Sequence, residues 1–152
     1  LDSRLHLPDP TAPRQIYRVC WPHARLLATA DATASSQSYL LYGEDIAVVE
    51  TQADWCFGQS LRDGYVGWVE RAALSRAVPA ITHRLRALGG YLYAAPDMKT
   101  PPRALLSMNS LLSVVGQSGD YAQLADGHFI YAPLLCPQDQ YQPDYVATAL
   151  EY

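Results

Sequence analysis

Short apolar stretches alternate with polar turns along most of the chain, and this pattern predicts strands rather than helices. In the first half, the stretches that favour strands are residues 25–29, 39–42, 46–50, 55–59 and 65–70. The pattern also predicts a polar loop over 30–37, a turn at Gly43-Glu44-Asp45 and a hairpin turn at Asp63-Gly64. Some five strands in about 55 residues imply a small barrel or closed sandwich, close to the lower size limit for independent folding.

The second half of the chain repeats the pattern of the first half. Residues 26–31 align with residues 92–97 at an offset of 66 residues, and the same offset places Gly43 over Asn109 and Trp55 over Tyr121. Glycine and asparagine are the residues that best tolerate a left-handed backbone, so the Gly43–Asn109 match predicts one turn common to both copies. The second Asp-Gly turn, at 126–127, follows at an offset of 63 residues from the first. We therefore predict an all-β chain with two small barrels in tandem.

The repeat and the breaks between its copies predict the domain boundaries. An extended N-terminal segment covers 1–16, the first barrel 17–77, a proline-containing linker 78–82, the second barrel 83–136 and a connector 137–152. Within the connector, Asp144 is a good helix N-cap, and the apolar spacing that follows predicts a short helix over 145–152. A helix this short is unstable alone in water, so its apolar face must pack on something else.

Composition and charge exclude several classes of function. The chain carries 11 Lys+Arg against 15 Asp+Glu, a net charge of −4, and this balance argues against binding to nucleic acid or anionic membranes. No apolar stretch is long enough to span a bilayer, so no membrane span is predicted. Cys20, Cys56 and Cys136 are an odd number without C-x-x-C spacing, which predicts buried free thiols, no metal site and no cofactor.

Two sets of residues resemble bacterial SH3-like (SH3b) domains. Residues 42–46 (Tyr-Gly-Glu-Asp-Ile), Trp55 and residues 63–69 (Asp-Gly-Tyr-Val-Gly-Trp-Val) are similar to the turn, strand tryptophan and final strand of that family. Residues 82–84, 93–102 and 114–115 are similar to the second SH3-like domain of NlpC/p60 cell-wall peptidases. Residues 144–152 resemble the opening helix of the papain-like catalytic domain in those peptidases. The resemblance implies two SH3-like barrels in tandem, followed by a short C-terminal helix.

The resemblance stops short of the catalytic residues. The family's nucleophile is a cysteine in an Asp-Cys-Ser-Gly motif that follows the opening helix, and none of the three cysteines here lies in such a motif. We therefore assign no catalytic residue. The resemblance implies the non-catalytic N-terminal half of a hydrolase that cleaves the γ-D-glutamyl–diamino acid bond of peptidoglycan stem peptides. Its implied partners are a muropeptide or stem peptide and a papain-like catalytic domain after Tyr152, in either the bacterial cytoplasm or the cell envelope.

A stem peptide with a free ammonium group requires a carboxylate or phenol, and its apolar part requires aromatic walls. The candidate ligand-binding residues are Tyr65, Asp31, Trp55, Trp68 and Glu44. Tyr65 leads because the resemblance implies a hydroxyl that faces a cleft after the hairpin glycine. A core position is the alternative for Tyr65 and Trp68, and a turn cap shared with Asp97 is the alternative for Asp31.

The second copy has different residues at the equivalent positions. His128 replaces Tyr65 and Tyr121 replaces Trp55, which predicts a spacer or orienting domain without the first copy's ligand site. Two other functions stay open at this point. One is a free-standing SH3-like scaffold that binds a protein partner through proline-rich segments. The other is a diverged enzyme that uses Cys56 or Cys136 with a histidine.

Overall fold

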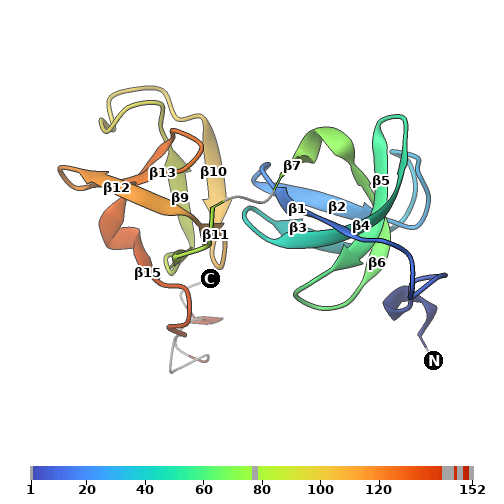
Figure 1. The fold of residues 1–152 in the computed structure, drawn as a ribbon. Helices are drawn as coiled ribbons and strands as arrows, with labels where there is room; N and C mark the ends of the chain where they lie inside the picture. Colours follow the sequence, from blue (N-terminus) through green and yellow to red (C-terminus); the bar gives the residue numbers. More distant parts are fainter. Residues whose placement is uncertain (1, 77–78, 142–145, 147–148, 151–152) are drawn as a thin grey trace. The chain divides into compact units, whose positions relative to one another are not determined.

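The structure, a computed structural model, describes residues 2–76, 79–141, 146 and 149–150. The chain divides into two compact units, Leu1–Val78 and Pro79–Tyr152. Both units consist almost entirely of short strands joined by turns (Figure 1). The prediction of a mostly β chain is therefore confirmed.

Over residues 2–76, the first unit contains seven strands and two turns of 3-10 helix. In chain order they are η1 (Ser3–Leu5), β1 (Gln15–Val19), β2 (His23–Leu27), β3 (Ser36–Leu41), β4 (Asp45–Gln52), β5 (Trp55–Ser60), β6 (Val66–Glu70), η2 (Arg71–Ala73) and β7 (Leu74–Arg76). The strands form one antiparallel sheet in the order β3-β2-β6-β5-β4-β1-β7. The five strands predicted from the sequence overlap β2 to β6, and η1 places one helical turn inside the segment expected to be extended.

Over residues 79–141, the second unit contains eight strands and one turn of 3-10 helix. These are β8 (His83–Leu85), β9 (Gly89–Leu92), β10 (Ala104–Ser107), β11 (Leu111–Leu112), β12 (Val114–Ser118), β13 (Tyr121–Leu124), β14 (Phe129–Tyr131), η3 (Ala132–Leu134) and β15 (Leu135–Pro137). They form a two-stranded sheet, β10-β9, and two three-stranded sheets, β11-β8-β15 and β12-β13-β14.

The two units share one pattern of strand pairing. β1 lies between β4 and β7 in the first unit, and β8 lies between β11 and β15 in the second. The hairpins β2–β3, β4–β5 and β5–β6 correspond to β9–β10, β12–β13 and β13–β14. The internal repeat seen in the sequence is therefore a repeat of topology.

The turns predicted from the alignment of the two copies are present. Gly43 and Asn109 both adopt a left-handed backbone, with φ angles of 83° and 71°. Gly64 and Gly127, in the two Asp-Gly turns, have φ angles of 78° and 89°. Each copy therefore reverses direction at the same two points, with the residue types for which a positive φ costs least.

A single core cluster fills the interior of the first unit. Leu26 and Leu40 are fully buried in it, together with residues from β1, β4, β5 and β6, including Ile46 and Val69. Strands from distant positions in the sheet order thus share one core, so the sheet is curled around it. The second unit buries alternate residues of its own strands, among them Leu92, Leu106 and Ile130.

The sequence predicted closed barrels, and the structure corrects this point. Among the described residues, no strand ladder joins β3 to β7, so the sheet of the first unit has two free ends. The physical reason is that side-chain packing around the core, rather than a closing ladder of hydrogen bonds, brings the ends of the sheet together. The predicted C-terminal helix over 145–152 falls largely outside the described residues.

Candidate functional site

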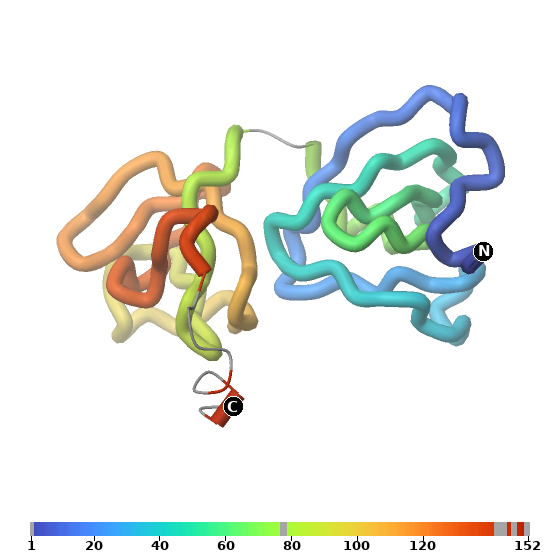
Figure 2. The backbone as a smooth tube through the Cα atoms, turned by 90° about the horizontal axis from the view of Figure 1, so that it is seen from below, coloured from blue at the N-terminus to red at the C-terminus, as the bar shows by residue number. Residues whose placement is uncertain are grey.

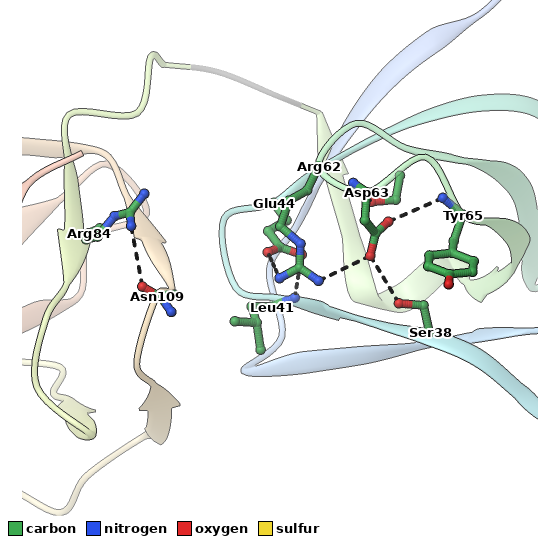
Figure 3. Close-up of polar contacts among 9 residues, drawn as sticks. Ser38, Leu41, Glu44, Arg62, Asp63, Tyr65, Arg84 and Asn109 are labelled. Atoms are coloured by element: carbon green, nitrogen blue, oxygen red, sulfur yellow. Dashed lines mark hydrogen bonds and ion pairs between the residues drawn. The ribbon is translucent and has the colours of Figure 1, made fainter. Parts of the chain in front are cut away.

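Tyr65 lies at the end of the hairpin that connects β5 to β6 (Figure 3). The backbone N–H of Ser60 donates to the carbonyl of Tyr65 at 2.9 Å, and the N–H of Gly64 donates to the carbonyl of Ser60 at 3.1 Å. The positive φ of Gly64 lets the chain turn directly before Tyr65. The Tyr65 side chain packs against the edge of the core cluster and is partly buried. Tyr65 is therefore compatible with both a core position and a ligand-binding position, because it contacts the core and still has accessible surface.

Asp63 links the hairpin to the neighbouring parts of the unit. One carboxylate oxygen accepts the N–H of Tyr65 at 3.3 Å, and the other accepts the hydroxyl of Ser38 at 3.3 Å and the Arg62 guanidinium at 3.2 Å (Figure 3). Burial raises the pKa of Asp63, but the hydrogen bonds of Ser60, Tyr65 and Arg62 outweigh it, so the pKa lies below its usual value. The hairpin thus carries a fixed negative charge beside Tyr65.

Glu44 is a buried carboxylate, with 3% of its surface exposed. Its Oε2 accepts the N–H of Leu41 at 3.0 Å, and its Oε1 accepts the Arg62 guanidinium at 2.7 Å (Figure 3). Burial raises the pKa of Glu44, and the Leu41 N–H and the Arg62 charge act in the opposite direction without cancelling it. Both oxygens are engaged within the protein, so Glu44 holds the turn before β4 and positions Arg62.

The raised pKa of Glu44 gives an expected pH dependence of stability. The folded state holds this proton more tightly than the unfolded state, so the contribution of Glu44 is fully present below its usual pKa of 4.5 and is lost as pH rises through the raised value. In Glu44→Gln this titration is absent. Between about pH 4 and pH 7, we expect the free energy of unfolding of Glu44→Gln to rise relative to that of the wild type. Urea unfolding measures both free energies. A constant difference across that range would contradict the assignment.

The N-terminal segment lies against the Tyr65 hairpin. The Arg4 guanidinium carbon lies over the Tyr65 ring, 5.4 Å from its centroid, and the side-chain amide of Gln59 donates to the carbonyl of Leu5 at 3.3 Å. Leu7 is buried, with 8% of its surface exposed. Figure 2 shows the dark-blue start of the chain beside the green β5–β6 region of the same unit. Tyr65 is therefore flanked by Asp63 on its own hairpin and by Arg4 from the N-terminal segment.

Asp31 lies in the exposed loop between β2 and β3. Its Oδ1 accepts both the N–H and the hydroxyl of Thr33, each at 2.7 Å, and these bonds lower the pKa of the carboxyl, the N–H bond most of all. In the second unit, Oδ1 of Asp97 accepts the N–H of Lys99 at 2.8 Å in the equivalent turn. Asp31 thus caps a turn that both units share, as the alternative interpretation of the sequence held.

Trp55 and Trp68 lie on the outer side of the β5–β6 hairpin. Cys56 and Val69, their neighbours in the chain, point into the core cluster, and neither tryptophan belongs to that cluster. Trp68 is opposite Phe57 in the ladder, with ring centroids 5.2 Å apart. Both tryptophans are half-buried. Trp68 is therefore available as an aromatic wall and does not fill the core.

The structure gathers only part of the predicted site. Glu44 and Tyr65 join one polar network through Arg62 and Asp63. Among the described residues, no hydrogen bond or ring contact connects Asp31, Trp55 or Trp68 to Tyr65. Sequence reasoning did not identify Ser38, Arg62 or Arg4 as neighbours of the site. For Arg62 the available signal was its position directly before the Asp-Gly turn, and Arg4 gave none because its contact joins distant parts of the chain.

The three cysteines differ in their surroundings. Cys56 is buried in the core cluster, and its sulfur contacts the Thr51 hydroxyl at 3.8 Å. The Cys136 sulfur lies near the carbonyls of Arg84 and Gln140. Cys20 is exposed and Cys136 half-buried, so only Cys56 fits the prediction of buried thiols, because the other two lie at the end of β1 and on the short strand β15. The described part of the chain holds no cluster of metal-binding side chains and no helix able to cross a membrane.

The second unit carries an aromatic outer surface that the sequence did not predict. Four side chains, which we call the tyrosine face, follow one another with ring centroids 6.4, 6.1 and 5.9 Å apart: Tyr91, Tyr93, Tyr121 and Tyr131. Tyr93 and Phe129 exchange backbone hydrogen bonds, which join β9 to β14 beneath this surface. Tyr91 and Tyr131 are 48% and 42% exposed, on a side of the strands that is usually polar. The outer surface of the second unit is thus partly aromatic.

The first unit, with its curled sheet and its Asp-Gly hairpin before Tyr65, has the features of an SH3-like domain. Residues 26–74 match the family model described as the bacterial dipeptidyl-peptidase Sh3 domain. This match runs from the middle of β2 to the start of β7 and includes the whole Tyr65 network. This part of the first unit is therefore similar to bacterial SH3 domains of the dipeptidyl-peptidase type.

Solved structures extend the likeness to both units. The chain superposes on an NlpC/P60 family protein from Bacillus cereus with a TM-score of 0.67 and 14% identity, over 90% of this chain and 61% of that one. NlpC2 and NlpC1 from Trichomonas vaginalis give TM-scores of 0.37 and 0.38 at 12% and 13% identity, over 86% and 96% of this chain and 49% and 53% of theirs. No curated protein sequence matches the chain. The chain thus shares the fold of about three fifths of the Bacillus cereus protein.

Proposed function

We propose that the chain is a substrate-binding SH3b pair of a cell-wall peptidase, and that its first unit selects stem peptides by their free amino end. The observation that carries this proposal is the Tyr65 hairpin, in which the half-buried Tyr65 follows the Asp-Gly turn and the ionised carboxylate of Asp63 accepts its backbone N–H, within the part of the chain that matches the dipeptidyl-peptidase Sh3 model. An ammonium group needs acceptors of this kind. A pair of SH3-like units whose second copy repeats the topology of the first supports the tandem arrangement.

Different residues of the first unit bind different parts of the stem peptide in this proposal. The Tyr65 hydroxyl accepts a hydrogen bond from the ammonium, and Asp31 supplies a second carboxylate from its exposed loop. Trp55 and Trp68 form walls against the apolar part of the peptide, on the outer side of the hairpin where they lie. Glu44 acts as a positioning residue, since it holds Arg62 against Asp63.

Bond cleavage belongs to a different part of the proposed enzyme. The chain spans 61% of the Bacillus cereus structure, and a papain-like domain would supply the cysteine nucleophile for the γ-D-glutamyl–diamino acid bond. The pair of SH3-like units would then act by binding and steric selection. A free amine on the peptide is compatible with the net charge of −4, because a mildly acidic protein attracts rather than repels a cationic end.

Replacement of Tyr65 by phenylalanine tests the proposal. The change keeps the ring and its packing but removes the hydroxyl, so a synthetic L-Ala-γ-D-Glu-diamino acid tripeptide with a free amino end should bind roughly tenfold or more weakly. Calorimetry or NMR titration of the 152-residue chain measures the effect. The N-acetylated tripeptide is the matched control and should bind both proteins equally poorly. Equal binding of the free-amine tripeptide to the two proteins would overturn the role of Tyr65.

The tyrosine face favours a second candidate function, a scaffold that binds a protein partner. Its rings are tilted against one another by 56° to 88°, so they meet edge to face rather than as a parallel stack. Aromatic surfaces are the usual docking sites of polyproline II helices, whose unpaired carbonyls need donors such as tyrosine hydroxyls. The same NMR titration with a proline-rich peptide decides the point. Shifts confined to Tyr91, Tyr93, Tyr121 and Tyr131 would favour the scaffold, and no shifts would exclude this ligand.

A further inference from the structure

The N-terminal residues 2–7, which we call the strap, are fastened to the first unit beside the proposed binding residue. Leu7 is buried and the carbonyl of Leu5 accepts the side chain of Gln59, so the strap has an apolar and a polar anchor. Gln59 also donates to the carbonyl of Gly64 at 2.9 Å, in the turn before Tyr65. The same glutamine therefore ties the strap to the hairpin that positions Tyr65.

Within the strap, Arg4 is held in a defined orientation. Asp2 accepts the guanidinium through both carboxylate oxygens, at 3.0 and 3.1 Å from Nε and 2.7 Å from the terminal nitrogen. A bidentate pair of this kind restricts the planar guanidinium more than a single contact would. The hydrogen bond from the Arg4 side chain lowers the pKa of Asp2 to about 2, so the pair stays charged at neutral pH. Arg4 then lies over the face of the Tyr65 ring.

An arginine over a tyrosine ring is chemically similar to an ammonium group beside the same residue. Both are cations that the ring attracts through its negative face, and both favour the electron-rich phenol oxygen as a neighbour. The guanidinium also places a permanent positive charge where the proposed ligand would bring its own. A cationic peptide end must therefore either displace Arg4 or bind against its charge.

We propose that the strap is a built-in competitor that lowers the affinity of the Tyr65 site for free-amine peptides, with Arg4 in the place of the ligand's cation. This inference rests on the proposed function of Tyr65 and adds regulation to that site. Release of the strap, by a partner or by any event that pulls residues 2–7 away, would open the site. The strap thus couples the N-terminal segment to peptide binding within one unit.

The test compares four variants of the 152-residue chain by NMR. Arg4→Ala removes the competing cation, Arg4→Lys keeps a cation, and Arg14→Ala removes the same charge from a different place, where Arg14 donates to the carbonyl of Pro10. Tyr65→Phe keeps the ring under Arg4 and removes the hydroxyl. The Tyr65 ring resonances, without peptide, report the strap contact, and the free-amine tripeptide, added afterwards, reports binding.

Arg4→Ala should shift the Tyr65 ring resonances and raise the affinity for the free-amine tripeptide about two- to fivefold, the range of an exposed cation–π contact. Arg4→Lys and Arg14→Ala should bind like the wild type. Unchanged ring resonances in Arg4→Ala would overturn the strap contact, and changed resonances with unchanged or weaker binding would overturn the competition. If the tripeptide binds no variant, the proposed function fails, and the competition fails with it, while the ring resonances still report the contact.

Discussion

Replacement of Leu26 by alanine is expected to lower the free energy of unfolding of the first unit by about 2 to 5 kcal/mol. Leu26 is fully buried in the core cluster, on the β2 strand that pairs with both β3 and β6. The loss has two parts, the free energy that burial of the removed methyl groups had contributed and the cost of the cavity that the surrounding strands cannot fill. A small domain has a total stability of about 5 to 15 kcal/mol, so this change removes a large share of it.

The sequence offers a convenient probe and a matched control for this experiment. All three tryptophans, Trp21, Trp55 and Trp68, belong to the first unit, so tryptophan fluorescence during urea unfolding follows that unit alone. Leu61→Ala is the same chemical change at a site with 55% exposure, and it should cost less than about 0.5 kcal/mol. Similar midpoints for the two variants would contradict the position of Leu26 in the core.

Replacement of Gly58 by alanine is expected to destabilise the first unit by about 3 kcal/mol, at the upper end of the usual cost of overpacking. A Cβ atom at Gly58 would lie 2.5 Å from the carbonyl oxygen of Ala47 and 3.0 Å from the Val48 Cα, both of them backbone atoms. Backbone atoms in a strand ladder cannot rotate away as a side chain does. The β4–β5 hairpin would therefore have to open at the point where it curls around the core.

Gly64→Ala provides the comparison for Gly58→Ala. At Gly64 the added Cβ would meet nothing closer than 3.9 Å, so the only cost is the positive φ of 78°, about 1 to 2 kcal/mol. We expect the urea midpoint, followed by tryptophan fluorescence, to fall further for Gly58→Ala than for Gly64→Ala. The reverse order would show that conformation, and not close approach, governs glycine in this hairpin.

Some of the site was open to prediction from the sequence and some was not. The Asp-Gly turn and the tyrosine after it are neighbours in the chain, so a local motif indicates them directly. Arg4 is different, because it reaches Tyr65 from 61 residues away along the chain, by a contact that no local pattern encodes. Glu44 was predicted as a ligand residue because of its charge. Only the fold shows that its two carboxylate oxygens already accept hydrogen bonds from the Leu41 N–H and the Arg62 guanidinium.

The tyrosine face is a second feature that the sequence did not predict. Alternation along β9, β13 and β14 predicts that every second side chain points outward. It does not predict that outward side chains of different strands contact one another. Tyr93 and Tyr121 meet because hydrogen bonds between Tyr93 and Phe129 place β9 beside β14. The sequence therefore predicted a spacer where the assembled strands present an aromatic surface.

By itself, the sequence determined that this protein is a chain of short strands in two copies that turn at Gly43 and Asn109 and again at Gly64 and Gly127. These features depend on residues close in the chain, whose backbone preferences are local. Only the tertiary structure decided that the sheet stays open at β3 and β7, that Trp68 lies outside the core, and that Arg4 covers Tyr65. Those outcomes depend on which distant surfaces pack together, and packing energy is shared among many residues rather than encoded in any short motif.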